Sequence, residues 1–318
     1  MSNLNQPSGD PEIVITRGNW RLVVAPFGAS MRGFAARTGD GAYVDVSTGY
    51  HGRDAKQGGE GDVLVPFPGR IAHGRYTFDG QSHQLDQNDK EGPAAIHGFV
   101  RNAVWNWSKK GDAIVFTTSF DEKEYPGYPF ALNASMTYAL TDAGLAVTTT
   151  VTNAGTGPAP VGVGFHPYYT VGSDLINADT LHVPFTKMIE FGEYFLPTGR
   201  ILDVAGTPLD FTSPRVIGDV IVNACYLAPR RDADGMARVR LSQPATGRSV
   251  TIWQDRAYDY VVLYSGNALP ENLRRRSLAI EPMSCATDAF NHEGWGTVRL
   301  EPGESFTGSW GVEAEGVV

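Results

Sequence analysis

The sequence predicts an all-β fold, a large antiparallel β-sandwich, from the spacing of its turn residues, the alternation of its apolar residues and the scarcity of helical periodicity. The 318 residues include 37 Gly and 20 Pro, which separate short stretches rich in Val, Ile, Thr, Tyr and Phe. Few segments repeat an apolar residue every three to four positions over a sustained length. We therefore expect short strands joined by turns, with very little helix.

The segment 145–152 has the clearest strand pattern. Its odd-numbered residues, from Leu145 to Val151, fall on one face because successive side chains of a strand point to opposite sides. Residues 141–144 read Thr-Asp-Ala-Gly, which is typical of a tight hairpin turn. The other expected strands are Glu12–Thr16, Arg21–Ala25, Ala113–Phe120, Ala131–Leu140, Ala237–Leu241, Ser249–Gln254, Tyr258–Tyr264 and Ser305–Val312.

We expect one domain over residues 1–318, with residues 1–11 forming a flexible N-terminal tail. The length would suit two average domains, but all-β sandwiches commonly use about 200–250 residues for one. The Gly- and Pro-containing stretch 155–160 is expected to be a connecting loop, because strand-like sequence resumes at Val161. The first ten residues lack the basic start and apolar stretch of a signal peptide.

The charge pattern argues against nucleic acid as a partner, and the lack of long apolar runs argues against a membrane-spanning helix. The formal net charge is −9 and no long run of Lys or Arg occurs, so an electrostatic footprint for nucleic acid is missing. No apolar run approaches the ~20 residues of a membrane-spanning helix. The short run Arg274–Arg276 predicts a solvated loop without a catalytic role. A neutral small molecule is the expected partner, and we expect a monomer or a weak homodimer.

The two cysteines, Cys225 and Cys285, are too few for a disulfide framework and lack the spacing of metal ligands. A reduced, cytoplasmic location is therefore the expectation.

Four segments each place an ionisable side chain beside Pro or Gly at the end of an apolar stretch, where a strand can deliver it to a cleft. Alone, His97 or His166 would more often be a hydrogen-bonded structural histidine, and Arg70 could be a surface ion pair. Glu281 follows the apolar run 278–280, where burial of a carboxylate is costly unless it is paired or functional. The segments are Val65–Ile71, Ala95–Arg101, Gly162–Tyr169 and Leu278–Ser284.

Taken together, these segments resemble the aldose 1-epimerase, or galactose mutarotase, family. The motifs Pro-Phe-Pro-Gly-Arg-Ile, Ile-His-Gly-Phe-Val-Arg, Gly-Phe-His-Pro-Tyr-Tyr and Ile-Glu-Pro-Met-Ser occur in the family's order, and the resemblance runs from about Trp20 to Val312. It implies a galactose mutarotase-like supersandwich. It also implies interconversion of the α and β anomers of a free sugar, with no metal or other cofactor.

The resemblance also implies roles for individual residues. Glu281 corresponds to the general base and His166 to the general acid. Arg70 and His97 correspond to substrate-holding residues, and Tyr168 is expected to bind the substrate beside the acid. The family's substrate-binding aspartate falls on Asn223 in this sequence.

This pair of side chains suits the chemistry. Opening a hemiacetal ring requires a base to remove the proton of the anomeric hydroxyl and an acid to protonate the ring oxygen. A glutamate with a pKa of about 4.3 is ionised at neutral pH, and a histidine near about 6.5 is protonated when its surroundings raise the pKa slightly. We therefore expect an ionised Glu281 and a protonated His166, each contributing ~10²–10⁴-fold to the rate.

Three positions depart from the family's pattern. Gly69 replaces a frequent Asn, Asn223 replaces the aspartate, and Val262 replaces a glutamine found in galactose-active members. These changes leave the acid and the base in place but alter the residues expected to bind the sugar's hydroxyls. The sequence therefore predicts the reaction but not which sugar is the substrate.

Three other functions compete with this interpretation. An epimerase of a phosphorylated or sulfonated sugar would need a cationic subsite. A non-catalytic sugar-binding or sensing module would not need both Glu281 and His166. A glycoside hydrolase or lyase would normally need a second carboxylate, for which the sequence has no persuasive motif.

Overall fold

The computed structural model describes residues 11–316, and their regular structure is almost entirely antiparallel β-strand. No α-helix occurs in this range, which confirms the all-β prediction. Residues 1–10 of the predicted tail lie outside the described residues. The short turns of 3-10 helix are η1 (Arg53–Ala55), η2 (Val100–Asn102), η3 (Ile176–Ala178), η4 (Glu193–Phe195) and η5 (Ala289–Asn291).

The larger of the two main sheets contains 12 strands and carries Glu281 of the candidate site. Its main path runs β1-β2-β3-β4-β16-β25-β24-β21-β18-β19, and β15 and β5 join it beside β25. The strands are β1 (Ile13–Arg17), β2 (Trp20–Ala25), β3 (Ser30–Arg37), β4 (Tyr43–Thr48), β5 (Val63–Leu64), β15 (Gly164–Phe165), β16 (Tyr168–Tyr169), β18 (Phe185–Phe191), β19 (Pro197–Asp203), β21 (Asn223–Pro229), β24 (Tyr260–Tyr264) and β25 (Leu278–Met283).

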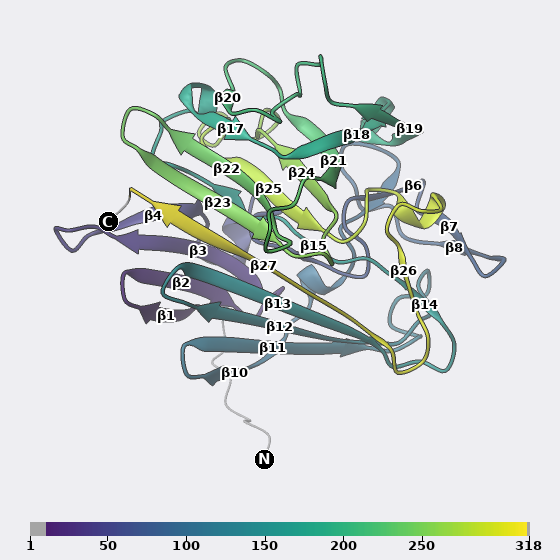
Figure 1. Cartoon of the computed structure of the whole chain (residues 1–318). Helices are drawn as coiled ribbons and strands as arrows, with labels where there is room; N and C mark the ends of the chain where they lie inside the picture. The colour runs from purple at the N-terminus through teal and green to yellow at the C-terminus, as the bar shows by residue number, and fades with distance from the viewer. Residues whose placement is uncertain (1–10, 317–318) are drawn as a thin grey trace.

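The second sheet has 9 strands and runs from β10 at the bottom of Figure 1 to β20 at the top. Its order is β10-β11-β12-β13-β27-β23-β22-β17-β20. The strands are β10 (Asn106–Lys110), β11 (Ala113–Phe120), β12 (Leu132–Leu140), β13 (Gly144–Asn153), β17 (Thr180–His182), β20 (Arg215–Val216), β22 (Ala237–Gln243), β23 (Arg248–Gln254) and β27 (Ser305–Glu315).

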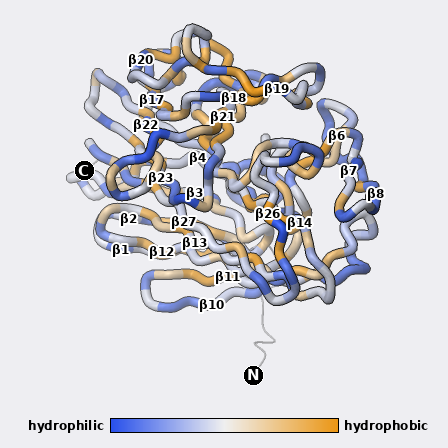
Figure 2. Tube along the Cα trace, turned by 45° about the vertical axis from the view of Figure 1, so that its right-hand side comes forward, coloured by the Kyte–Doolittle hydropathy of each residue, from blue (hydrophilic) through white to orange (hydrophobic). Residues whose placement is uncertain are grey.

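Three two-stranded ribbons lie on the right of the sandwich in Figure 1. They pair β6 (Arg70–Ala72) with β9 (Ala94–Ile96), β7 (Arg75–Phe78) with β8 (Gln81–Gln84), and β14 (Ala159–Val161) with β26 (Val298–Leu300). Figure 2 shows β8 in hydrophilic colours and β11 in more hydrophobic ones, as expected for an outer ribbon and a strand of the core.

The alternation of β13 explains how the two sheets pack. From Leu145 to Val151 its odd-numbered residues are buried and the residues between them are at least partly exposed, as the sequence predicts. Val147 lies between Tyr138 on β12 and Trp310 on β27. Trp310 contacts Phe165 of the larger sheet, with ring centroids 4.9 Å apart. The apolar inner faces of both sheets therefore form a shared core.

The predicted strands agree closely with the observed ones. Each of the nine overlaps a strand, and Ala113–Phe120 has the same bounds as β11. The predicted hairpin turn joins β12 and β13, where Thr141 N–H donates to the Gly144 carbonyl at 2.8 Å. A side chain at Gly144 would lie 2.1 Å from the Val312 carbonyl oxygen, so the close approach of β27 requires glycine there.

The prediction that Arg274–Arg276 is solvated is wrong for its middle residue. Arg274 and Arg276 are exposed, but Arg275 is 9% exposed. Its guanidinium donates to the carbonyl oxygens of Gly218 and Val220. Backbone carbonyls of a distant segment therefore satisfy a buried cation that looks like part of a surface run in the sequence.

Within residues 11–316, no helix has the length and apolar character needed to cross a membrane.

Replacing Trp310 with Ala is expected to lower the free energy of unfolding by about 3–5 kcal/mol, because it leaves a cavity where the two sheets meet. Trp107→Ala is the matched control, since Trp107 is 40% exposed and its loss is expected to cost less than about 1 kcal/mol. Urea unfolding followed by tryptophan fluorescence and circular dichroism measures both. Equal losses in the two variants would contradict the shared core.

Candidate active site

Strand β25 brings Glu281 and His166 together, although they lie 115 positions apart in the chain. β25 pairs with β15 and β16, the two short strands on either side of His166. Gly164 lies opposite Met283, and the second pair continues the same register. His166 therefore falls directly opposite Glu281, in the break between the two short strands.

The two side chains meet where little solvent reaches them. His166 Nε2 lies 3.4 Å from Glu281 Oε1, and the residues are 7% and 1% exposed. Among the described residues, Glu281 Oε2 and His166 Nδ1 are buried without a hydrogen-bond partner. Buried polar atoms are normally hydrogen-bonded, so both are available to a ligand that supplies donors and acceptors.

The β6–β9 ribbon places Arg70 and His97 next to this pair. Arg70 lies opposite Ile96 at the end of the ribbon, and His97 N–H donates to the Gly69 carbonyl at 2.9 Å. The His97 ring stands edge-on to His166, with centroids 5.3 Å apart. His97 has φ +67°, a conformation that non-glycine residues adopt rarely and that clusters at functional sites.

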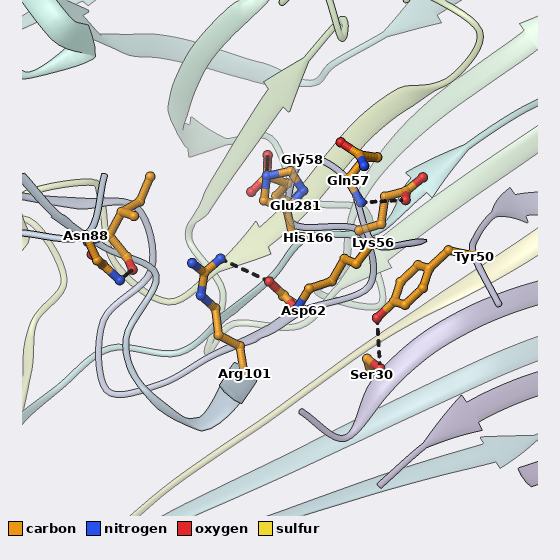
Figure 3. A network of polar contacts seen from close by, with 12 residues as sticks. Ser30, Tyr50, Lys56, Gln57, Gly58, Asp62, Asn88, Arg101, His166 and Glu281 are labelled. Carbon is orange, nitrogen blue, oxygen red and sulfur yellow. Dashed lines mark hydrogen bonds and ion pairs between the residues drawn. The ribbon is translucent and has the colours of Figure 1, made fainter. Parts of the chain in front are cut away.

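A cavity of about 300 Å³ joins these residues, a volume at the lower end of small-molecule sites. Five predicted residues line it, namely Arg70, His97, His166, Asn223 and Glu281. Figure 3 shows the His166–Glu281 pair with the polar residues around it. Much of the remaining wall is apolar, formed by Ile96, Phe191, Val262, Leu269 and Met283.

Arg70 is held by two carboxylates and an aromatic ring. Its Nε donates to Asp89 at 2.7 Å and its Nη2 to Glu91 at 2.6 Å, and the guanidinium lies 5.3 Å from the centroid of Phe195. Its backbone N–H donates to Thr287 Oγ1 at 2.8 Å. These contacts fix the cation at the cavity wall before any ligand arrives.

Comparison with known proteins agrees with this geometry. The aldose 1-epimerase family model matches residues 11–312. The uncharacterized protein YihR of Escherichia coli strain K12 is 34% identical over 245 residues, covering 77% of this chain and 75% of that protein. Pig (Sus scrofa) galactose mutarotase is 26% identical over 269 residues, covering 77% and 76% of the two chains. The GalM/aldose epimerase homologue from C. elegans superposes with a TM-score of 0.86 at 20% identity, covering 97% of this chain and 100% of that one.

The chain belongs to the aldose 1-epimerase family. The galactose mutarotase-like sandwich expected from the motifs is therefore confirmed.

Tyr168, expected from the sequence to bind substrate, lies beside His166 but not at the cavity wall. It is 1% exposed and does not line the cavity. Its ring stacks on His166, with centroids 5.2 Å apart, and its hydroxyl donates to the Gly58 carbonyl at 2.9 Å. The contact suits a residue that orients the imidazole.

A buried aspartate next to the cavity was not found by the sequence reasoning. Asp62 is fully buried and accepts hydrogen bonds from Lys56 Nζ at 2.7 Å and Arg101 Nη1 at 3.1 Å (Figure 3). Its carbonyl also accepts the His166 N–H at 3.0 Å. The signal that singled out Glu281, a carboxylate against an apolar run, is present here too, because Asp62 precedes Val63–Val65.

Burial opposes the charge states that the sequence led us to expect for Glu281 and His166. Burial raises the pKa of Glu281 well above its ordinary value, and the neighbouring Arg70 lowers it by less. Burial lowers the pKa of His166 to about 3. The sequence reasoning assumed an ordinary glutamate and a histidine with a raised pKa, but loss of solvent opposes both charges. Burial by itself therefore favours the neutral forms, a protonated Glu281 and an uncharged His166.

One departure from the family's pattern has a packing reason. Gly69 has φ +64°, and a side chain there would lie 2.6 Å from Thr287 Oγ1. Thr287 is the residue whose hydroxyl accepts the Arg70 N–H. Glycine at position 69 leaves room for Thr287, and Thr287 in turn positions the backbone of Arg70.

We predict that Gly69→Ala destabilises the protein by about 1–3 kcal/mol more than Gly80→Ala. Gly80 also has a positive φ of +75°, but a side chain there would meet nothing within 4 Å, so the difference isolates crowding against Thr287. Urea unfolding of both variants measures it. Identical losses would show that backbone strain alone requires glycine at 69.

Replacing Glu281 with Gln is expected to stabilise the protein increasingly as the pH rises. The folded pKa of Glu281 is raised, so the wild type loses stability from the unfolded pKa, about 4.3, up to the folded one, at up to about 1.4 kcal/mol per pH unit. Glutamine does not ionise and avoids this loss. Urea unfolding at pH 5 and pH 8 tests this, with the exposed Glu293→Gln as control. A gap between Glu281→Gln and wild type that does not widen at pH 8 would contradict the raised pKa.

Proposed function

We propose that this protein is an aldose 1-epimerase that interconverts the α and β anomers of a free hexose, with Glu281 as general base and His166 as general acid. The observation that carries the proposal is the direct contact of these two buried side chains at the wall of a cavity that Arg70 and His97 share. The anomeric oxygen and the ring oxygen of a pyranose are bonded to one carbon. The two groups that serve them must therefore lie close together.

The reaction then needs only proton transfers and a bond rotation. Glu281 takes the proton of the anomeric hydroxyl while His166 protonates the ring oxygen, the bond from the anomeric carbon to the ring oxygen breaks, and an aldehyde forms. Rotation about the adjacent carbon–carbon bond exposes the other face of the aldehyde. Ring closure on that face returns both protons to their original groups.

The proton count of the pair fits this cycle. Glu281 and His166 share one proton throughout, carried by the histidine before ring opening and by the glutamate afterwards. Burial by itself opposes both charges and so favours the second arrangement. Sugar hydroxyls that bond the unpartnered Glu281 Oε2 and His166 Nδ1, together with the positive Arg70, stabilise the charged arrangement needed to start.

Arg70 and His97 hold the sugar in this proposal. Burial and the neighbouring His166, Arg101, Arg70 and Lys56 lower the pKa of His97 well below its ordinary value. A neutral imidazole carries one N–H donor and one acceptor nitrogen, and its buried Nδ1 has no partner among the described residues. His97 is therefore suited to a sugar hydroxyl, which also donates and accepts.

The decisive experiment follows freshly dissolved α-anomers of glucose, galactose and other aldoses by polarimetry or NMR. We expect wild type to accelerate mutarotation and Glu281→Gln or His166→Asn to reduce the rate at least about 100-fold. His83→Asn is the control, because His83 stacks on Tyr76 outside the cavity. Unchanged rates in both active-site variants would refute the assigned roles.

A sugar with an anionic group is a second candidate substrate, supported by the surroundings of Arg101. This residue lines the cavity, and its Nε is buried without a partner among the described residues while Nη1 bonds Asp62. Lys90 also lines the cavity. A phosphate or sulfonate could use such donors. Turnover of 6-phosphate or 6-sulfonate sugars but not of the neutral hexoses would favour this candidate.

The mutarotation assay, combined with calorimetry, also tests whether the protein is a non-catalytic sensing module. Calorimetric binding of a sugar without faster mutarotation would favour a non-catalytic role.

We also carry forward two expectations about the protein's setting. The free, buried thiols of Cys225 and Cys285 support a reducing, cytoplasmic location. A monomer or weak homodimer remains our expectation, which sedimentation analysis tests.

A further inference from the structure

Strand β24 presents two side chains to the cavity, Val262 and Tyr264. They lie two positions apart and therefore on the same face of the strand. Val262 is opposite Glu281 on β25, and Tyr264 is opposite Asn223 on β21. The strand that runs between the general base and Asn223 thus offers one polar group to a ligand, the Tyr264 hydroxyl.

That hydroxyl has an unused hydrogen. Tyr264 Oη accepts the backbone N–H of Ala268 at 3.0 Å, which occupies a lone pair of the oxygen. A phenol also donates one hydrogen, and none of the hydrogen bonds in residues 11–316 has the Tyr264 hydroxyl as its donor. The accepted bond fixes the oxygen and leaves its hydrogen for another acceptor.

The loop that supplies the Ala268 N–H is itself anchored. The Asn267 side chain accepts hydrogen bonds from Ser265 Oγ at 2.6 Å and from the buried Arg275 at 3.3 Å. Arg275 in turn donates to the carbonyl of Gly218. The position of the Tyr264 hydroxyl is therefore set before a ligand binds, which reduces the entropy lost on binding.

The groups around Tyr264 belong to the candidate site. The charges that act on its hydroxyl are those of Glu91, Arg70 and Glu281, and all three residues line the cavity. Burial raises the pKa of Tyr264 above its ordinary value, so the phenol keeps its hydrogen at neutral pH and acts as a donor.

We propose that Tyr264 is a sugar-binding residue that donates its hydroxyl hydrogen to one particular hydroxyl of the substrate. The proposal rests on the function proposed above and names a specificity determinant of that site. Val262 places an apolar side chain beside it, so this part of the cavity distinguishes a polar edge of the sugar from an apolar one.

The test combines Tyr264→Phe with monodeoxy analogues of an aldose that the wild type accepts. Tyr264→Phe is expected to lower kcat/KM for the parent sugar about tenfold. With the analogue that lacks the contacted hydroxyl, Tyr264→Phe and wild type are expected to differ less than twofold. Tyr260→Phe is the matched control, because Tyr260 lies on the same strand and does not line the cavity.

Two results would overturn the proposal. A Tyr264→Phe effect below twofold on the parent sugar would show that the hydroxyl binds nothing. An equal loss with every monodeoxy analogue would show that the variant disturbs the site without losing a specific contact.

Calorimetric affinities keep this test separate from that of the enzymatic function. If the wild type binds sugars without accelerating mutarotation, Tyr264→Phe and wild type are compared by their dissociation constants for the parent sugar and its monodeoxy analogues. The same pattern of differences would support the sugar-binding role of Tyr264, and its absence would refute that role. If the wild type binds no sugar at all, both proposals are wrong.

Discussion

The register between β25 and its two short partners, β15 and β16, is the constraint on which the site depends. It places Glu281 opposite His166 in a break in the sheet, and the 3.4 Å contact follows from that pairing. A shift by one residue would turn either side chain to the other face. The shared core that Trp310 and Phe165 help to form fixes the strands, so the sandwich's packing and the chemistry are coupled.

Burial of this pair opposes stability and leaves polar atoms that a ligand can satisfy. It raises the pKa of Glu281 and lowers that of His166, because both charges lose solvent. It also leaves Glu281 Oε2 and His166 Nδ1 without partners among the described residues. Unpartnered buried groups cost free energy, and a polyhydroxylated ligand is the kind of molecule that satisfies them.

Glycines permit the close approaches around the pair. A side chain at Gly59 would lie 3.1 Å from the His166 ring, and one at Gly69 would collide with Thr287. A hydrogen bond joins Gly58 to Tyr168, which stacks on His166. The imidazole is consequently held by its neighbours on several sides, which restricts its orientation.

The sequence by itself determined the all-β class, the nine predicted strands and the set of motifs that carry Arg70, His97, His166 and Glu281. The alternation of apolar residues and the residue order of the motifs are enough to predict the fold class, the strands and these four residues, because both are properties of consecutive residues. Only the tertiary structure decided what lies between the motifs. It buried Arg275 and joined Asp62 to Lys56 and Arg101. It also stacked Tyr168 on His166 away from the cavity wall, and it buried Glu281 and His166, which opposes the charges expected from the sequence. Each of these depends on contacts between distant segments and on the solvent that those contacts remove, and neither is encoded in the order of neighbouring residues.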